Sequence, residues 1–153
     1  SFGPPMAVAP LNSVRRVVEY AAERIPAGKL LLGLPNYAYD WTLPYRSGQS
    51  RAVSIGNEAA VQLAVQTGAE IQFDETAQTP YFHYTAPDGA VHEVWFEDAR
   101  SCAAKLALVE EFALRGVGVW NFMRPFTVLF SLLDYQFKIL TPHAPLDTSR
   151  RIR

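Results

Sequence analysis

The sequence has 153 residues, of which 49% are hydrophobic, 12% aromatic and 19% charged, so it can bury a sizeable core as one domain. Its 14 Lys and Arg residues nearly balance its 15 Asp and Glu residues, and the formal charge of -1 leaves no basic surplus for neutralising nucleic-acid phosphates. A single cysteine excludes an internal disulfide, and no apolar run approaches the roughly 20 residues that a membrane helix needs.

The chain opens without a methionine on a proline-rich stretch, residues 1–10, which predicts an extended lead-in and suggests a piece of a longer protein. Apolar residues then recur at helical spacing over residues 14–25, and Asn12 or Ser13 can cap this helix. Residues 29–34 follow as a run that is apolar on both faces. This run predicts a strand buried on both sides, as in a parallel sheet.

The middle of the chain changes character. Residues 40–52 are polar and irregular, which predicts a loop. A helix is expected over residues 58–67, capped by Asn57. Two β-rich runs then flank an Ala-Pro-Asp-Gly turn at residues 86–89, which predicts a hairpin. Residues 53–96 therefore predict a small α+β unit with antiparallel strands.

Residues 98–137 again show helical patterns and a short apolar strand, as at the start of the chain. Asp98 can cap a third helix, which presents Cys102 on its apolar face and ends at Gly116. Residues 117–120 form a second short apolar strand, and residues 127–137 a last helix. The chain therefore predicts two strand–helix steps of an α/β protein, interrupted by the α+β unit.

Few residues suggest catalysis. The carboxylates of Glu97 and Asp98 could share acid and base work, but successive side chains point apart, which favours Asp98 as a cap and Glu97 as a solvated neighbour. His83 and His92 lie on the two arms of the hairpin and could be cross-strand neighbours, but together with His143 they lack metal-ligand spacing. No nucleophile motif or phosphate loop is present, and we expect no metal and no cofactor.

Aromatic residues gather where the two predicted buried strands end. Asn36, Tyr37, Tyr39 and Trp41 follow the first strand, and Trp120 ends the second. In α/β barrels the carboxyl ends of the strands build the active site. Aromatic rings there can stack on the apolar faces of sugars. The alternative is that these rings only fill the top of the core.

Several motifs, in order along the chain, resemble glycoside hydrolase family 18, the chitinase family. Residues 29–37, KLLLGLPNY, resemble its seventh barrel strand. Residues 81–82, YF, and 94–98, VWFED, resemble its inserted α+β domain and the return into the barrel. Residues 116–120, GVGVW, resemble its eighth strand, whose terminal Trp forms the floor of the central sugar subsite. Three further stretches resemble the bacterial spore cortex-lytic and sporulation glycosylases: residues 3–10, GPPMAVAP, 39–45, YDWTLPY, and 74–78, DETAQ.

The resemblance implies a fold: an α/β protein that holds the last strands and helices of a partial (β/α)8 TIM barrel, with an inserted small α+β domain. Residues 1–40 and 97–140 would belong to the barrel, and residues 41–96 would form the insertion. We expect residues 141–153 to be a mobile tail.

The resemblance also implies a substrate, β-1,4-linked N-acetylglucosamine in peptidoglycan or chitin. Tyr37, Tyr39, Trp120 and Asn36 would contact the sugar. The family's catalytic segment, Asp-x-x-Asp-x-Asp-x-Glu, ends in the general acid and does not occur in the sequence. Because the N-acetyl oxygen of the substrate acts as the nucleophile in this family, the acid is the essential protein group. We therefore expect no catalytic residue in this chain.

Two functions remain open at this point. The chain is either the C-terminal portion of such a glycosidase or a non-catalytic carbohydrate-binding or scaffold protein derived from the same fold. The parent is expected to be a secreted, cell-wall or spore-associated bacterial protein. Neither nucleic acid nor a membrane is an expected partner, whereas an exposed apolar sheet edge could allow the chain to self-associate.

Overall fold

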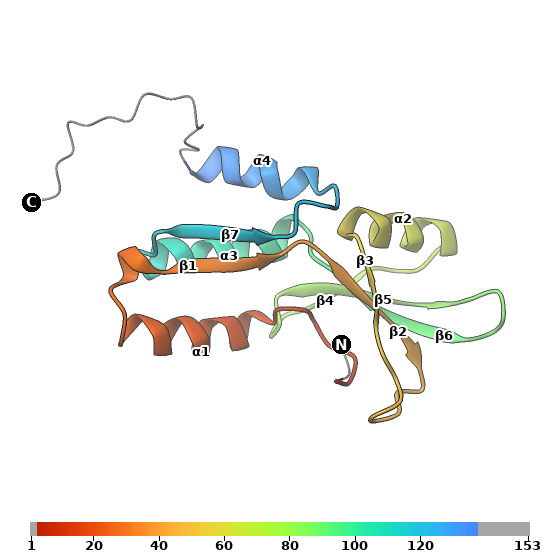
Figure 1. The fold of residues 1–153 in the computed structure, drawn as a ribbon. Helices are drawn as coiled ribbons and strands as arrows, with labels where there is room; N and C mark the ends of the chain where they lie inside the picture. Colours follow the sequence, from red (N-terminus) through yellow and green to blue (C-terminus); the bar gives the residue numbers. More distant parts are fainter. Residues whose placement is uncertain (1–2, 138–153) are drawn as a thin grey trace, which may run out of the picture.

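A computed structural model describes residues 3–137 (Figure 1). The first elements are α1 (Leu11–Ala22), a one-turn 3-10 helix (Ala27–Lys29) and β1 (Leu31–Pro35). The middle of the chain forms β2 (Ala38–Leu43), β3 (Val53–Ile55), α2 (Asn57–Thr67), β4 (Gln72–Asp74), β5 (Thr79–Thr85) and β6 (Val91–Trp95). The last elements are α3 (Ala99–Glu111), β7 (Gly116–Trp120) and α4 (Thr127–Gln136). None of the helices between residues 3 and 137 is long and apolar enough to cross a membrane, and the expected tail lies outside the described residues.

The strands form two separate sheets. Strands β1 and β7 pair in parallel, although the 80 residues of 36–115 lie between the end of β1 and the start of β7. The other strands form an antiparallel sheet in the order β3-β2-β6-β5-β4. Helices α1, α3 and α4 lie next to the parallel pair and share one core with it. The five-stranded sheet extends to one side, with α2 beside it (Figure 1). The expected strand–helix steps with an α+β unit between them are therefore present.

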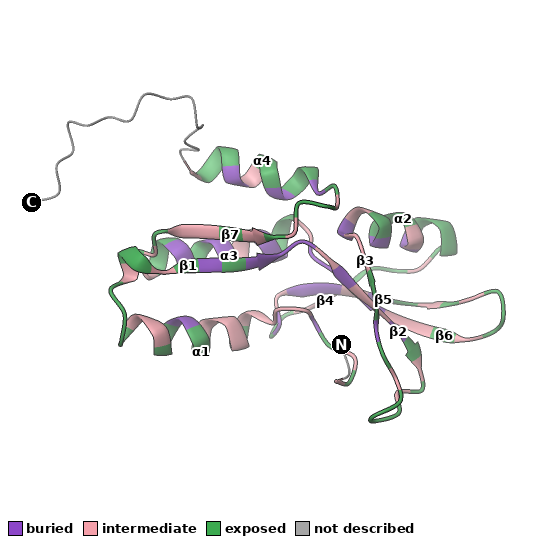
Figure 2. Cartoon of the chain, in the orientation of Figure 1, coloured by how far each residue is buried: buried purple, intermediate pink, exposed green. Residues whose placement is uncertain are grey.

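Only one face of the parallel pair is buried. Leu32 and Leu34 pack in a core with Leu106 of α3 and Leu129 of α4. On the opposite face Leu31 is 60% exposed, and the neighbouring strand positions are also open (Figure 2). The prediction of a strand buried on both sides is wrong for the described chain, because the helices pack on one face only.

The five-stranded sheet begins earlier than expected. Ala38 and Phe82 on one face pack against Ala60 and Ala64 of α2. The predicted loop at residues 40–52 instead begins with most of β2, so the expected domain boundary at residue 41 falls inside a strand. The alternation of Tyr39, Trp41 and Leu43 with polar residues is the local signal of this strand, which hydrogen-bonds to β3 and β6.

The ends of α1 and α2 differ from the expectation. Neither Asn12 nor Ser13 caps α1, because Pro10 occupies the cap position. Asn57 does not cap α2 either. Gly56 stands at that cap, while the Asn57 side chain turns inward and its Oδ1 accepts a hydrogen bond from the main-chain N of Glu97 at 2.9 Å.

The start of α3 and the hairpin are confirmed. Asp98 caps α3 and forms a reciprocal capping box with Ser101, in which each side chain accepts from the other's main-chain N–H at 3.0 and 2.9 Å. The helix ends at Glu111, however, and Gly116 begins β7. In the hairpin, Gly89 has the positive φ that the turn needs.

Candidate functional site

The site is built where β1 and β7 end together. Because the two strands are parallel, their carboxyl ends lie at the same edge, with Pro35 opposite Trp120. One residue beyond β1, the main-chain N–H of Asn36 donates to the carbonyl oxygen of Trp120 at 2.6 Å. This bond extends the pairing by one step and brings Tyr37 close to Trp120.

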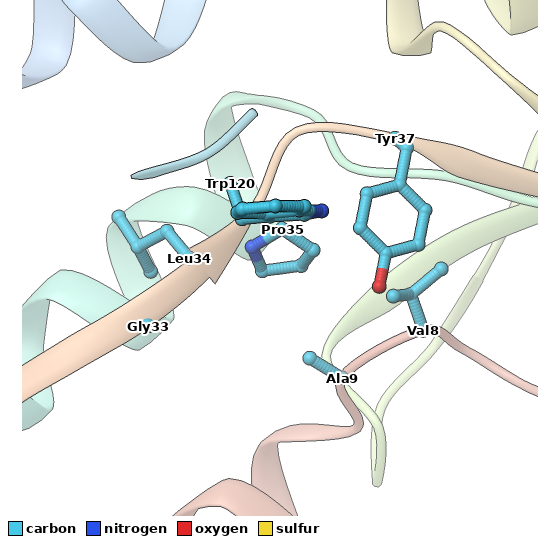
Figure 3. A pocket seen from close by; sticks show the side chains of 7 residues that line it. All are labelled: Val8, Ala9, Gly33, Leu34, Pro35, Tyr37 and Trp120. Atoms are coloured by element: carbon cyan, nitrogen blue, oxygen red, sulfur yellow. The ribbon is translucent and has the colours of Figure 1, made fainter. Parts of the chain in front are cut away.

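Tyr37 and Trp120 share a pocket of about 260 Å³ at this edge. In Figure 3 the indole nitrogen of Trp120 points toward the ring of Tyr37, and the Tyr37 hydroxyl points toward the N-terminal segment. The other lining residues are small or apolar: Val8, Ala9, Gly33, Leu34 and Pro35. Trp120 is 70% exposed, so its ring is available to a ligand.

An edge-to-face row of rings continues from the pocket along β2. The ring centroids of Tyr37 and Tyr39 lie 5.5 Å apart, and those of Tyr39 and Trp41 lie 6.2 Å apart. Tyr39 does not line the pocket itself and is partly buried, whereas Trp41 is fully buried. Burial raises the pKa of the Tyr37 phenol, and the adjacent Tyr39 adds to the shift, so Tyr37 keeps its proton and can donate a hydrogen bond.

Asn36 is not exposed to the pocket. Its side chain is fully buried, and its Nδ2 donates to the carbonyl oxygens of Asn121 at 2.7 Å and Arg124 at 2.9 Å. The structure therefore places Asn36 behind the pocket, against the segment that follows Trp120. A direct contact between Asn36 and a sugar, as expected from the sequence, does not fit this burial.

Comparison with known proteins decides the family. The profile of Glycosyl hydrolases family 18 matches residues 4–124. The chain belongs to this family. It is 46% identical over 140 residues to the cortical fragment-lytic enzyme of Bacillus subtilis (strain 168), which covers 92% of this chain and 32% of that protein. This family 18 chain thus spans about a third of the length of the curated relatives that it matches.

Solved structures of similar proteins share the fold. The spore cortex-lytic enzyme SleL of Bacillus megaterium QM B1551 matches with a TM-score of 0.89 and 44% identity, over 92% of this chain and 33% of that one. A chitinase from Chromobacterium violaceum ATCC 12472 matches with a TM-score of 0.79 and 30% identity, over 87% and 40% of the two chains. The mixed α/β fold is therefore similar to chitinase-like structures.

In this family 18 chain the pair Glu97 and Asp98 is structural. Asp98 caps α3. The Oε2 of Glu97 lies 2.9 Å from the Nζ of Lys105, and both side chains are 1% exposed. Burial raises the pKa of Glu97, and the Lys105 ammonium opposes that shift. The expectation that Glu97 is solvated is wrong, because its carboxylate is buried and forms an ion pair with Lys105 of α3.

Among the described residues, the histidines and the cysteine do not form a metal site. His83 lies opposite Glu93 and His92 opposite Tyr84, so the side chains of the two histidines are on opposite faces of the sheet. The cross-strand pairing that the sequence left open is therefore not formed. Within residues 3–137 no cluster of His, Cys, Asp or Glu could hold a metal ion, and His143 lies outside them. Burial raises the pKa of the Cys102 thiol to about 12, so this residue acts as a small core side chain.

Sequence reasoning missed the residues that fasten the segment after Trp120. The guanidinium of Arg124 reaches β3, where its Nη2 donates to the carbonyl oxygen of Ser54 at 3.0 Å. Glu58 accepts from the main-chain N of Thr127 at 2.9 Å and so holds the start of α4. No local pattern signals these contacts, because about 70 residues of chain lie between the partners.

Proposed function

We propose that this chain forms one wall of the carbohydrate cleft of a glycosidase that hydrolyses β-1,4-linked N-acetylglucosamine polymers, in peptidoglycan cortex or chitin. The observation that supports this best is the exposed indole of Trp120 beside Tyr37, at the carboxyl ends of two parallel strands. Two relatives are named as a cortical fragment-lytic enzyme and a chitinase, and both names indicate an amino-sugar polymer.

The chemistry of the pocket suits a sugar ring. An N-acetylglucosamine ring presents apolar C–H faces, which an open indole such as Trp120 can cover, and hydroxyls at its rim. The protonated phenol of Tyr37 offers a hydrogen-bond donor next to the indole. Tyr39 touches Tyr37 and would orient its ring, or meet a neighbouring sugar unit.

We also propose that the parallel pair is part of a larger barrel. Strands β1 and β7, with α1, α3 and α4, would be consecutive parts of a (β/α)8 barrel, and residues 38–95 an insertion between them. This division follows the start of β2 rather than the boundary at residue 41. The open face that carries Leu31 would then face the barrel interior.

We assign no catalytic residue to this chain. The acidic motif of the family does not occur in these 153 residues, and Glu97 is occupied by Lys105. The general acid would come from the rest of a longer protein, since the chain spans only about a third of its relatives. A complete protein that binds sugar without cleaving it would instead support a non-catalytic binding or scaffold role.

Self-association of the 153-residue chain is part of the proposal. An apolar groove of about 780 Å³ runs between β7 and α4, and Phe130 and Leu133 line it. Nearby, Phe122 is 72% and Met123 89% exposed. Because β1 and β7 pair only with each other among the described residues, a second copy can add its strands at these edges and cover the groove.

Sugar binding is tested by titrating the chain with an N-acetylglucosamine tetramer in a calorimeter. Trp120→Ala should weaken binding about tenfold or more, since a central aromatic anchor is lost. Tyr135→Ala removes an 88% exposed aromatic ring from α4 and should leave the affinity unchanged. Equal affinities for the wild type and Trp120→Ala would contradict the proposed wall.

Hydrolysis is tested on the same chain. We expect no release of reducing ends from N-acetylglucosamine oligomers, because no general acid is assigned here. The complete protein should release them under the same conditions. Turnover by the 153-residue chain alone would refute the assignment of the acid to another segment.

A further inference from the structure

The ring of Trp120 is not held in place by burial. It is 70% exposed, and Phe122 and Met123, two and three residues further on, are 72% and 89% exposed. Hydrophobic packing therefore contributes little to the orientation of this segment. The direction of the indole depends on how the backbone of residues 120–124 is held.

Asn36 holds both ends of that backbone. Its main-chain N donates to the Trp120 carbonyl at 2.6 Å. The two hydrogens of its side-chain amide go to the carbonyls of Asn121, at 2.7 Å, and Arg124, at 2.9 Å. An asparagine amide has two donors, and both are used on this one segment. The side chain is fully buried, so no water competes for these bonds.

The five-stranded sheet supports the same segment from the other side. The Nη1 of Arg124 donates to Ser54 Oγ at 3.0 Å and to the carbonyl of Ile55, and its Nη2 donates to the carbonyl of Ser54 at 3.0 Å. The buried amide of Asn57 lies 3.5 Å from Asn36 Oδ1. The segment after Trp120 is thus attached to both sheets.

We propose that Asn36 is a positioning residue for Trp120, and that Arg124 supports it by linking the segment to β3. This inference rests on the proposed function, because the indole is held ready for a sugar ring. Without the Asn36 amide, two carbonyls would lose their buried partner and the segment would move. A mobile indole must be ordered when the sugar binds, which lowers the affinity.

The test uses the 153-residue chain labelled with 5-fluorotryptophan. Fluorine NMR should resolve three tryptophans, of which Trp41 and Trp95 are buried and Trp120 is open. Trp120→Phe identifies the third signal. In Asn36→Ala we expect that signal alone to broaden or shift, and binding of an N-acetylglucosamine tetramer to weaken about tenfold.

Two comparisons separate positioning from a loss of stability. Val94→Ala removes buried volume from the five-stranded sheet and should lower the stability, with the Trp120 signal and the affinity unchanged. Arg124→Ala changes a partly exposed side chain, so it decides the question if Asn36→Ala does not fold. It should act in the same direction as Asn36→Ala.

The outcomes are distinct. An unchanged Trp120 signal in Asn36→Ala and Arg124→Ala would overturn the positioning role. A wild-type protein that does not bind the tetramer would overturn the proposed function, while the fluorine signals would still decide whether Asn36 holds Trp120.

Discussion

At the scale of single residues, Glu97 and Lys105 form a buried ion pair that carries a large desolvation cost. Both side chains are 1% exposed, and Glu97 Oε1 has no hydrogen-bond partner among the described residues. Removing two charges from water is costly, and their attraction compensates only while both are present. The pair is therefore far more sensitive to loss of one partner than an exposed ion pair would be.

Lys105→Met should destabilise the fold by about 3–5 kcal/mol, because it leaves the Glu97 carboxylate buried without a cation. Urea unfolding followed by circular dichroism measures the change. Lys29→Met, at an exposed position, should stay within about 0.5 kcal/mol of the wild type. A loss for Lys105→Met no larger than that of the control would show that the pair is not coupled to folding.

The same pair predicts a pH dependence. Burial raises the pKa of Glu97 in the folded chain above its unfolded value of about 4.3. The folded chain therefore holds this proton more tightly, and its contribution to stability is complete below about pH 4.3 and falls as the pH rises through the raised pKa. Without the Lys105 ammonium the pKa rises further.

The stability deficit of Lys105→Met should therefore be smaller near pH 4 than at pH 7. Unfolding curves over this range measure it. The variants Glu97→Gln and Glu97→Gln/Lys105→Met both lack the carboxyl at this site, so the difference in stability between these two should not show this pH dependence. A deficit for Lys105→Met that is constant with pH would contradict the assignment.

At the scale of elements, the start of α3 is defined by local chemistry, whereas the starts of α1 and α2 are not. The reciprocal bonds of Asp98 and Ser101 satisfy main-chain N–H groups that an isolated helix end leaves free. At α2, Gly56 leaves Asn57 available to bond Glu97 instead. A polar side chain at the start of a helix can thus accept a hydrogen bond either from the helix itself or from the main chain of a distant segment.

Asp98→Ala should cost about 1 kcal/mol of stability, because the Ser101 N–H loses its acceptor at the start of α3. Thermal or urea unfolding checks this. Asp134→Ala changes an exposed aspartate within α4 and should be nearly neutral. Equal effects of the two substitutions would mean that the capping box contributes nothing.

At the scale of the whole molecule, the five-stranded sheet and the parallel pair differ in completeness. The antiparallel sheet has α2 on one face and a core of its own. The parallel pair has helices on one face and an exposed opposite face. A two-stranded parallel sheet is rare as an independent unit, because such sheets are normally covered on both faces.

We therefore predict that the 153-residue chain self-associates as its concentration rises, which light scattering over a dilution series would show. The double variant Phe122→Asp/Met123→Asp places charge beside the groove and should shift the chain toward monomer. Val65→Asp changes a 77% exposed residue on α2 and should have no effect. A wild-type chain that stays monomeric at high concentration would contradict the prediction.

Much of the element order could be read from local patterns. The apolar stripe of α1, the Pro-Asp-Gly turn and the Asp98 cap each depend on neighbours within a few residues, and the structure has all three elements. Strand β2 was missed by the sequence analysis, although Tyr39, Trp41 and Leu43 alternate with Asp40 and Thr42 as in a strand. Its pairing partners, on β3 and β6, could not be identified from local sequence.

In the candidate site, too, some residues could be predicted from local sequence and others could not. The positions of Tyr37 and Trp120 just after two apolar strands indicated that they meet, because parallel strands end at one edge. The roles of Asn36, Arg124 and Lys105 were not readable. Each depends on partners that only the packing of separate segments brings within hydrogen-bond distance.

Local residue patterns in the 153 residues thus predicted the helices, the hairpin and the ends of the two parallel strands, since spacing and turn chemistry act within a few residues. Which faces are covered, and what each buried polar side chain bonds, depended on segments that lie far apart in the chain and meet only in the folded protein. The physical reason is that a buried amide or charge takes the partner that folding brings near it, whatever lies beside it in sequence.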